Sequence, residues 1–154
     1  MQTISGDLIA LARTGHFDVI AHGCNCFNTM GAGIAKTIKA HFPAAYAADM
    51  ATRKGDRTKL GTCSSAVIPT HGNLVVVNAY TQFDWRGAGM KVDYDAVASC
   101  MRWIKNHQAG KRIGLPKIGA GLAGGDWGRI AGIIGKELDG ESITVVEYRS
   151  AADA

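Results

Sequence analysis

The sequence predicts an α/β fold with helices on both faces of a mixed, mostly parallel sheet. Short apolar runs alternate with amphipathic helical segments along the whole chain, which is the pattern of parallel strands joined by crossover helices. Two strand-like runs, 63–68 and 73–80, follow each other with only the turn Thr70-His71-Gly72-Asn73 between them. We expect this pair to form an antiparallel hairpin, which makes the sheet mixed.

The elements can be placed in order along the chain. The first strand is expected at 2–5, and Asp7 stands where the N-cap of the next helix belongs. Helix 43–54 should end at Gly55, and Pro116 should end the strand at 113–115, because proline cannot donate to a sheet ladder. Further strands are expected at 17–21 and 142–148, and further helices after Gly31-Ala32-Gly33, over 92–107 and after Asp126.

The length and composition fit one folded domain. The chain has 154 residues, of which 47% are hydrophobic and 19% charged, so it can bury a core and is not disordered. We expect a single domain over 1–150 and a frayed tail over 151–154. The sequence shows no repeat, linker or low-complexity segment.

Composition also bounds the compartment and the partners. No apolar run approaches the ~20 residues of a membrane span, and no basic region precedes an apolar core at the N-terminus. A cytoplasmic protein without a membrane partner is expected. Cys24 and Cys26 are spaced too tightly for a zinc or redox pair, so we predict reduced thiols, no metal and no cofactor. The net charge of +4 comes from scattered residues. This charge permits a nucleic-acid partner but gives no evidence for one. The charge either attracts an anionic small molecule or only aids solubility.

Two glycine-rich loops follow predicted strands and open predicted helices. In 113–127, glycines stand at 119, 121, 124 and 125, and Asp126 then opens a helix with Ile130, Ile133, Ile134 and Leu138 on one face. The second loop, Gly31-Ala32-Gly33-Ile34-Ala35, also opens a helix. Backbone N–H groups at such helix starts favour an anion, so two of them can clamp a diphosphate. A flexible turn before a capped helix is the alternative. Neither loop has the Walker pattern, and GxGxxG is absent at Gly31.

Several motifs in order resemble a macro domain over nearly the whole chain. They are Asp7-Leu8 after Gly6, Asp-Val-Ile-Ala-His-Gly-Cys-Asn (18–25), Met-Gly-Ala-Gly-Ile-Ala (30–35), Pro-Lys-Ile-Gly-Ala-Gly-Leu (116–122) and Val-Val-Glu-Tyr (145–148). The chain looks most similar to small stand-alone macro domains of bacteria and phages in the ADP-ribose 1″-phosphate-processing and terminal ADP-ribose glycohydrolase branch. The resemblance implies a three-layer α/β/α fold that binds ADP-ribose at the carboxyl ends of the strands.

The resemblance also implies roles for individual residues. Asp7 would accept from the adenine amino group with support from the Leu8 N–H, and Asn25 would contact the distal ribose. Tyr148 would lie near the adenine, unless it is a core aromatic at a strand end. The two phosphate loops and their flanks would supply the remaining contacts, from Gly31, Ala32, Gly33, Ile34, Ala35, Gln82, Pro116, Ile118, Gly119, Ala120, Gly121, Leu122 and Ala123.

The chain departs from this branch where the branch carries its catalytic pair. The branch has a lysine after the hairpin strand and an aspartate after the second loop, whereas this chain has Thr81-Gln82 and Ala123 there. Lys91 could substitute for the lysine.

Other residues could carry the chemistry instead. Catalytic candidates are His22 as a general base, Asn25, and Asp126 to orient a water. His22 could instead only pack at a strand end, and Asp126 could be only a helix N-cap.

Three functions stay open at this point. The first is a hydrolase acting on the distal ribose of ADP-ribose derivatives, of the 1″-phosphate phosphatase type or removing ADP-ribose from protein or nucleic-acid adducts. The second is an ADP-ribose reader without turnover. The third is an α/β protein for another nucleotide.

Overall fold

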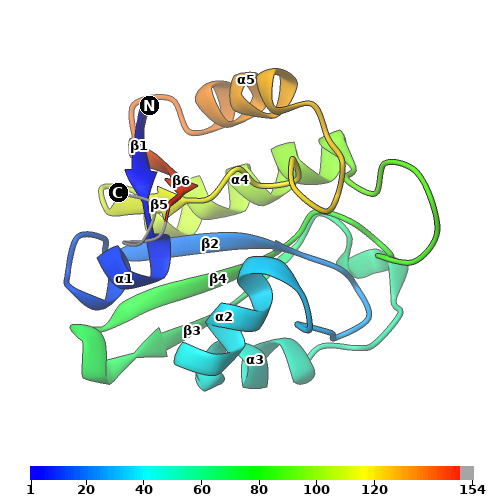
Figure 1. The fold of residues 1–154 in the computed structure, drawn as a ribbon, viewed down its shortest axis with the longest axis horizontal. Coiled ribbons are helices and arrows are strands. Elements are labelled where there is room, and N and C mark those ends of the chain that lie inside the picture. The colour runs from blue at the N-terminus through cyan, green and yellow to red at the C-terminus, as the bar shows by residue number, and fades with distance from the viewer. Residues whose placement is uncertain (150–154) are drawn as a thin grey trace.

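A computed structural model describes residues 1–149, and these form three layers around one sheet (Figure 1). The sheet has six strands in the order β1-β6-β5-β2-β4-β3. All neighbouring strands run parallel except β3 and β4, which form the predicted antiparallel hairpin. The strands are β1 (Gln2–Gly6), β2 (Val19–Cys24), β3 (Cys63–Ile68), β4 (Leu74–Tyr80), β5 (Arg112–Leu115) and β6 (Ser142–Tyr148).

Five α-helices cover the two faces of the sheet. They are α1 (Leu8–Arg13), α2 (Gly33–His41), α3 (Pro43–Met50), α4 (Tyr94–Gln108) and α5 (Trp127–Glu137), with 3₁₀ turns η1 (Arg57–Lys59) and η2 (Pro69–His71). Helices α4 and α5 lie on one face, and α1, α2 and α3 lie on the other (Figure 1). The predicted three-layer α/β/α fold is therefore confirmed, with a mixed and mostly parallel sheet.

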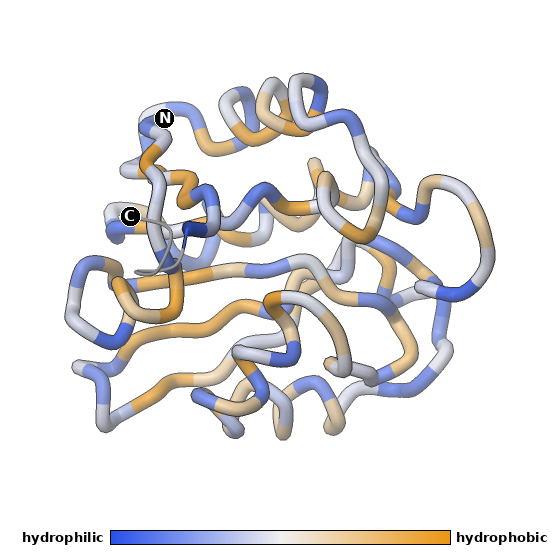
Figure 2. Tube along the Cα trace, viewed as in Figure 1, coloured by the Kyte–Doolittle hydropathy of each residue, from blue (hydrophilic) through white to orange (hydrophobic). Residues whose placement is uncertain are grey.

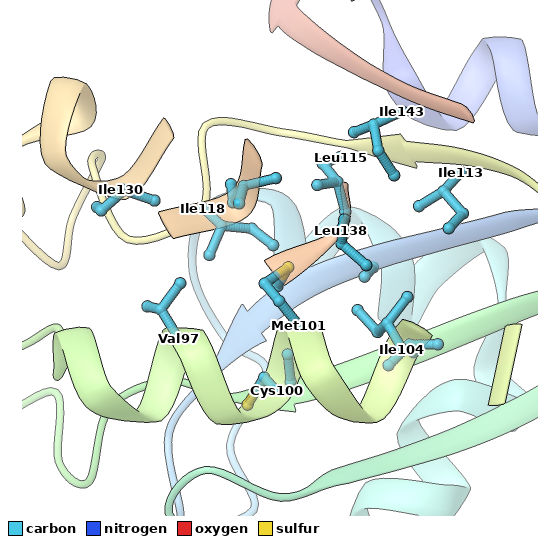
Figure 3. Packing of buried hydrophobic residues seen from close by; sticks show 14 of the residues in the cluster. Val97, Cys100, Met101, Ile104, Ile113, Leu115, Ile118, Ile130, Leu138 and Ile143 are labelled. Atoms are coloured by element: carbon cyan, nitrogen blue, oxygen red, sulfur yellow. The ribbon is translucent and has the colours of Figure 1, made fainter. Parts of the chain in front are cut away.

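The side-chain alternation of β2 shows how the two faces are built. Val19 and Ala21 pack in the core under α4 and α5, while Ile20 packs in the core under α1, α2 and α3. All three side chains are fully buried, as expected for a strand covered on both faces. Figure 2 shows hydrophobic residues along the middle of the sheet, and Figure 3 shows the α4 and α5 side of this core.

The helix faces predicted from periodicity are confirmed. Val97, Cys100, Met101 and Ile104 of α4 are all buried against the sheet (Figure 3). On α5, Ile130 and Ile134 are buried, and Ile133 is only partly buried. Figure 3 also places Ile118, just beyond β5, in this cluster, which anchors the start of the second glycine loop in the core.

The largest differences between predicted and observed boundaries are in β2 and α3. The strand expected at 17–21 is β2, Val19–Cys24, so it runs further toward the glycine loop than predicted. The helix expected at 43–54 ends at Met50, and a turn precedes Gly55. The first difference matters for the site, because it moves His22 from a loop into the strand.

The five parallel strands end at one edge of the sheet. Gly6 pairs with Tyr148, Leu115 with Val145, and Cys24 with Tyr80. The segments that follow β1, β6, β5, β2 and β4 therefore meet along this edge, which is where open α/β sheets bind ligands. The sheet order puts the segment after β1 at one end of this edge and the segments after β2 and β4 toward the other.

Candidate ligand-binding cleft

A cleft of about 720 Å³ opens at the carboxyl edge of the sheet between the two glycine loops. Most of the residues predicted to bind ligand line it. These are Asn25, Gly31, Ala32, Gly33, Ile34, Ala35, Gln82, Pro116, Ile118, Gly119, Gly121, Leu122 and Ala123. The sequence prediction that the two loops face one space is thus supported by the geometry.

The first loop ends at the start of α2. Ala32 is the N-cap, in extended conformation and without a side-chain cap bond, and Gly33 follows at φ +58°. The N-cap side chain accepts from none of the first N–H groups of α2, and Gly33, Ile34 and Ala35 line the cleft, which is an arrangement that favours an anion. Helix α2 contains no acidic residue in its first turn to compete.

The second loop is closed by its own glycines. The Gly125 N–H donates to the Gly119 carbonyl at 2.7 Å, and a Cβ on either residue would lie 2.6 Å from a Val92 methyl. By contrast, a Cβ on Gly121 would meet nothing within 4 Å. Two of the four glycines are therefore required for packing against Val92, and only Gly121 is both open and at the cleft.

The segment before α4 is hydrogen-bonded to the second loop. The N–H groups of Lys91 and Val92 donate to the Ala123 carbonyl at 2.8 and 3.3 Å. Gln82 in turn forms a β-bridge with Val92. As a result, Gln82, Lys91 and Ala123 lie together at the end of the cleft near β4, and all three line it.

The positions that correspond to the catalytic lysine and aspartate of the resembled branch lie at this end of the cleft. Thr81 is buried, and its Oγ1 lies so close to Gly23 that a Cβ there would approach it to 2.8 Å. Lys91 also lines the cleft, and its Nζ donates to the Ala88 carbonyl at 3.1 Å. Trp85, from the loop between β4 and α4, also lines the cleft.

Asn25 reaches the cleft with a fixed side chain. Its Oδ1 accepts from the Phe27 N–H at 2.8 Å, and its Nδ2 donates to the Thr29 hydroxyl at 2.8 Å and to the Thr29 carbonyl at 3.3 Å. The residue is 8% exposed. Its amide therefore shapes the turn as well as facing the cleft.

His22 does not lie at the cleft, and we correct the prediction that it serves as a general base. Its side chain is fully buried, and Nε2 lies 2.7 Å from Asn78 Oδ1. Asn78 donates in turn to the Ala45 carbonyl of α3, so the imidazole faces the α3 layer. Burial lowers the pKa of His22 to about 4, partly offset by the Asn78 hydrogen bond. The physical cause is the longer strand β2, in which alternate side chains point to opposite faces.

Asp126 and Ala120 also lie away from the cleft lining. Asp126 is the N-cap of α5, with Oδ1 accepting from the Gly128 N–H at 3.0 Å, and it is exposed. The hydrogen bond expected of the capping alternative is present, and the carboxylate does not line the cleft, so its role in orienting a water stays a prediction. Ala120 packs against the core beside α4 and α5, so its side chain turns inward where we expected a ligand contact.

The three residues expected near adenine lie beyond the cleft lining, at the β1 and β6 end of the same edge. Asp7 is the N-cap of α1, and its Oδ1 accepts from the N–H groups of Ile9 and Ala10 at 3.0 and 3.2 Å. Leu8 is buried. Tyr148 ends β6 with 77% exposure, which excludes the alternative of a core aromatic.

The cleft includes residues that sequence reasoning did not assign. They are Gly23, Cys24, Thr29, Trp85 and Lys117, whereas Thr81 and Lys91 were named only in connection with the missing catalytic pair. Lys117 Nζ pairs with Glu147 Oε1 at 2.8 Å. Burial raises the pKa of the Cys24 thiol, so it is protonated at neutral pH. Gly23 and Cys24 follow the strand predicted at 17–21, and Lys117 follows the strand predicted at 113–115, which was the sequence signal for these three residues.

The described chain offers no metal site. Within residues 1–149, no group of three or more His, Cys, Asp or Glu side chains is placed to hold a metal ion. Helices in the same range are too short or too polar to cross a membrane.

The fold and the cleft define a three-layer α/β/α protein with a cleft between two glycine loops at its sheet edge, and comparisons with known proteins identify its family. The family model described as Macro domain matches residues 21–134. An uncharacterised 17.5 kDa protein from the tk-vs intergenic region of Enterobacteria phage T4 is 38% identical over 152 residues, covering 94% of each chain. The chain belongs to the macro domain family.

Solved structures agree with this assignment. A protein of unknown function from Bacteroides thetaiotaomicron matches with a TM-score of 0.79 and 25% identity, over 95% of this chain and 96% of that one. The DarTG protein of Thermosipho africanus, solved in complex with ADP-ribose, matches with a TM-score of 0.72 and 18% identity. That match covers 99% of this chain and 42% of the larger one, and at this identity it speaks for the fold alone.

Proposed function

We propose that the cleft binds ADP-ribose along the carboxyl edge of the sheet. The observation that carries this proposal is that the starts of α2 and of the second loop face one cleft from opposite sides. A diphosphate between them would accept from backbone N–H groups of both. Macro domain membership and a fold relative solved with ADP-ribose support the same ligand.

The order of the strands sets the direction of the ligand. From β1 to β2 the sheet takes three steps, or about 14 Å at the usual strand spacing. Adenine at Asp7 and Tyr148 would leave the diphosphate over β5 and β2, and the distal ribose toward Asn25, Thr81 and Gln82. Asp7 Oδ2, which accepts no hydrogen bond from residues 1–149, suits an exocyclic amine, and the exposed ring of Tyr148 suits a base.

At the distal ribose we propose hydrolysis of a 1″ substituent, with a phosphate as the leaving group. Lys91 supports this because it brings a cation beside Gln82 at that end. Its ammonium would hold the 1″-phosphate and offset negative charge that develops as water attacks phosphorus. Attack of water forms a new P–O bond and the P–O bond to the ribose 1″-oxygen breaks. The proton that the water loses goes to that oxygen, so the products are inorganic phosphate and ADP-ribose.

A non-catalytic reader is the second candidate, and one observation favours it. Among the described residues that line the cleft, none is an aspartate, glutamate or histidine. Cleft chemistry would then depend on Lys91, on backbone donors and on the substrate's own phosphate. Hydrolysis of protein or nucleic-acid adducts of ADP-ribose is a variant of the proposed hydrolase activity. The larger leaving group of such an adduct would extend past Trp85.

Turnover of ADP-ribose 1″-phosphate separates these candidates. We expect the wild-type protein to release inorganic phosphate, and Lys91→Met to release it at least tenfold more slowly. Lys111→Met, at an exposed position before β5, is the matched control and should match wild type. Binding without phosphate release would support the reader, and release from an ADP-ribosylated peptide or oligonucleotide alone would support the adduct hydrolase.

A further inference from the structure

Lys59 is a buried lysine outside the cleft lining that the proposed function does not use. It ends the 3₁₀ turn η1 and is 7% exposed. Its Nζ donates to Asn28 Oδ1 at 2.5 Å and to the Cys26 carbonyl at 3.2 Å. The ammonium also lies 4.8 Å from the centre of the Tyr80 ring. Lysine is almost never this buried unless its charge is met by specific partners.

The partners of Lys59 belong to the turn 25–29. Within residues 1–149, no carboxylate lies within ion-pair distance of its ammonium. Tyr80 donates to Asp49 Oδ1 at 2.7 Å, and Asp49 Oδ2 is buried without a partner. The nearest buried carboxylate is therefore held by Tyr80, and the lysine charge depends on oxygen dipoles of the turn.

The same turn is fixed from a second side by residues 52–55. Asn28 adopts the left-handed region at φ 58°, and its Nδ2 donates to the Thr52 carbonyl at 2.9 Å. The Cys26 carbonyl accepts from the Gly55 N–H at 2.7 Å. Lys59 contacts both Asn28 and Cys26, the two turn residues that form these hydrogen bonds. Without its ammonium, Asn28 Oδ1 would lose its shortest contact while Asn28 stays in a strained conformation.

The turn 25–29 connects the residues that Lys59 contacts to the cleft. Asn25 and Thr29 both line the cleft, and they are joined by the Asn25 amide to Thr29 hydroxyl bond. Between them lie Cys26 and Asn28, the two residues that Lys59 contacts. A shift of these two residues would therefore move both cleft-lining side chains together.

We propose that Lys59 is a positioning residue for the distal end of the cleft, acting through the turn 25–29. This inference rests on the proposed function only in taking ADP-ribose as the ligand. Lys59 itself does not touch the cleft. Its removal should impair the part of the site formed by Asn25 and Thr29, and leave the adenine end at β1 and β6 unaffected.

The test compares Lys59→Met with Lys54→Met, an exposed lysine close by in the sequence. Methionine keeps most of the apolar length of lysine and removes the donors. Calorimetric titration with ADP-ribose and with AMP should show at least a tenfold rise in the Kd for ADP-ribose and less than a twofold change for AMP. Amide hydrogen exchange of the ligand-free protein should rise at least tenfold within 25–29 and stay near wild type in β5 and β6. Lys54→Met should leave all three unchanged.

A chemical rescue makes the role of the ammonium explicit. Lys59→Ala removes three methylenes and the ammonium, and n-propylammonium carries the same atoms. We expect propylammonium chloride to restore ADP-ribose affinity at least threefold in this variant, compared with potassium chloride at equal ionic strength. Wild type should not respond.

Other outcomes overturn the inference or separate it from the proposed function. Lys59 does not position the distal end if the Kd of Lys59→Met for ADP-ribose is within twofold of wild type. The same conclusion follows if its Kd for AMP rises as much as its Kd for ADP-ribose and amide hydrogen exchange rises throughout the protein. If the wild type binds no ADP-ribose, the proposed function fails, and hydrogen exchange within 25–29 still decides whether Lys59 holds the turn.

Discussion

Gly33 and Leu122 approach each other across the cleft from opposite glycine loops. A Cβ on Gly33 would lie 3.5 Å from Leu122 Cδ1, which is ordinary van der Waals contact. Leu122 is nevertheless 81% exposed, because it stands at the outer rim and covers the cleft more than the core. The two loops thus nearly close over the space where a diphosphate would lie.

Leu122→Ala should affect binding and not stability. The side chain packs against little else, so the free energy of unfolding should change by less than about 0.5 kcal/mol. ADP-ribose should dissociate faster and its Kd should rise threefold to tenfold, because the rim over the diphosphate opens. Stopped-flow dissociation and urea unfolding measure the two effects. Val67→Ala, also exposed but on β3, is the control and should bind as wild type does.

The two kinds of glycine in the second loop should respond oppositely to alanine. In Gly125→Ala the new methyl would lie 2.6 Å from Val92 Cγ1 and 2.7 Å from the Gly119 carbonyl oxygen, so we expect a loss of about 1–3 kcal/mol in stability. Gly121→Ala has open space and should keep its stability, while its methyl enters the cleft and weakens ADP-ribose binding. Equal stability of the two variants would contradict the packing role of Gly125.

His22 should make the protein less stable in mild acid. Its pKa is lowered to about 4 in the folded state, against about 6.5 in the unfolded chain, so below pH 6.5 the unfolded state binds more protons. The stabilisation is complete above pH 6.5 and is lost as pH falls toward 4, by up to about 3 kcal/mol. Urea unfolding at pH 7 and pH 4.5 should show this slope in wild type and a smaller one in His22→Gln. An equal slope in both would mean that His22 titrates normally.

Asp126→Ala should separate capping from catalysis. Loss of the bond to the Gly128 N–H should cost about 1 kcal/mol of stability. ADP-ribose affinity, and any turnover, should stay within twofold of wild type, because the carboxylate does not line the cleft. A tenfold loss of turnover at unchanged affinity would restore the catalytic role that the sequence suggested.

Sequence reasoning located the loops because glycines and a proline mark their ends. The strand 142–148 and the hairpin were placed correctly for the same reason, since turns flank them. His22 was misplaced because both faces of β2 are buried. No alternation of polar and apolar residues then shows where the strand ends or which way each side chain points. Asn25, three residues later, lay where expected because it follows the strand.

Lys59 shows a different limit of sequence reasoning. Its charge is buried by contacts with Cys26 and Asn28, which lie about thirty positions earlier in the chain. A lysine among Arg57, Thr58 and Leu60 has the composition of an ordinary exposed turn. Only the packing of two distant segments makes it internal. The sequence therefore predicted the glycine loops, but not the buried groups that hold them.

The most direct measurement is a calorimetric titration of the wild-type protein with ADP-ribose beside AMP. A Kd for ADP-ribose in the low micromolar range or below, with AMP bound at least tenfold more weakly, is the result predicted if both glycine loops hold the diphosphate and the distal ribose. The protein is first shown to be folded, and it is used at about 100 times that range, on the order of 100 μM. Absence of heat with ADP-ribose under these conditions would contradict the proposed ligand.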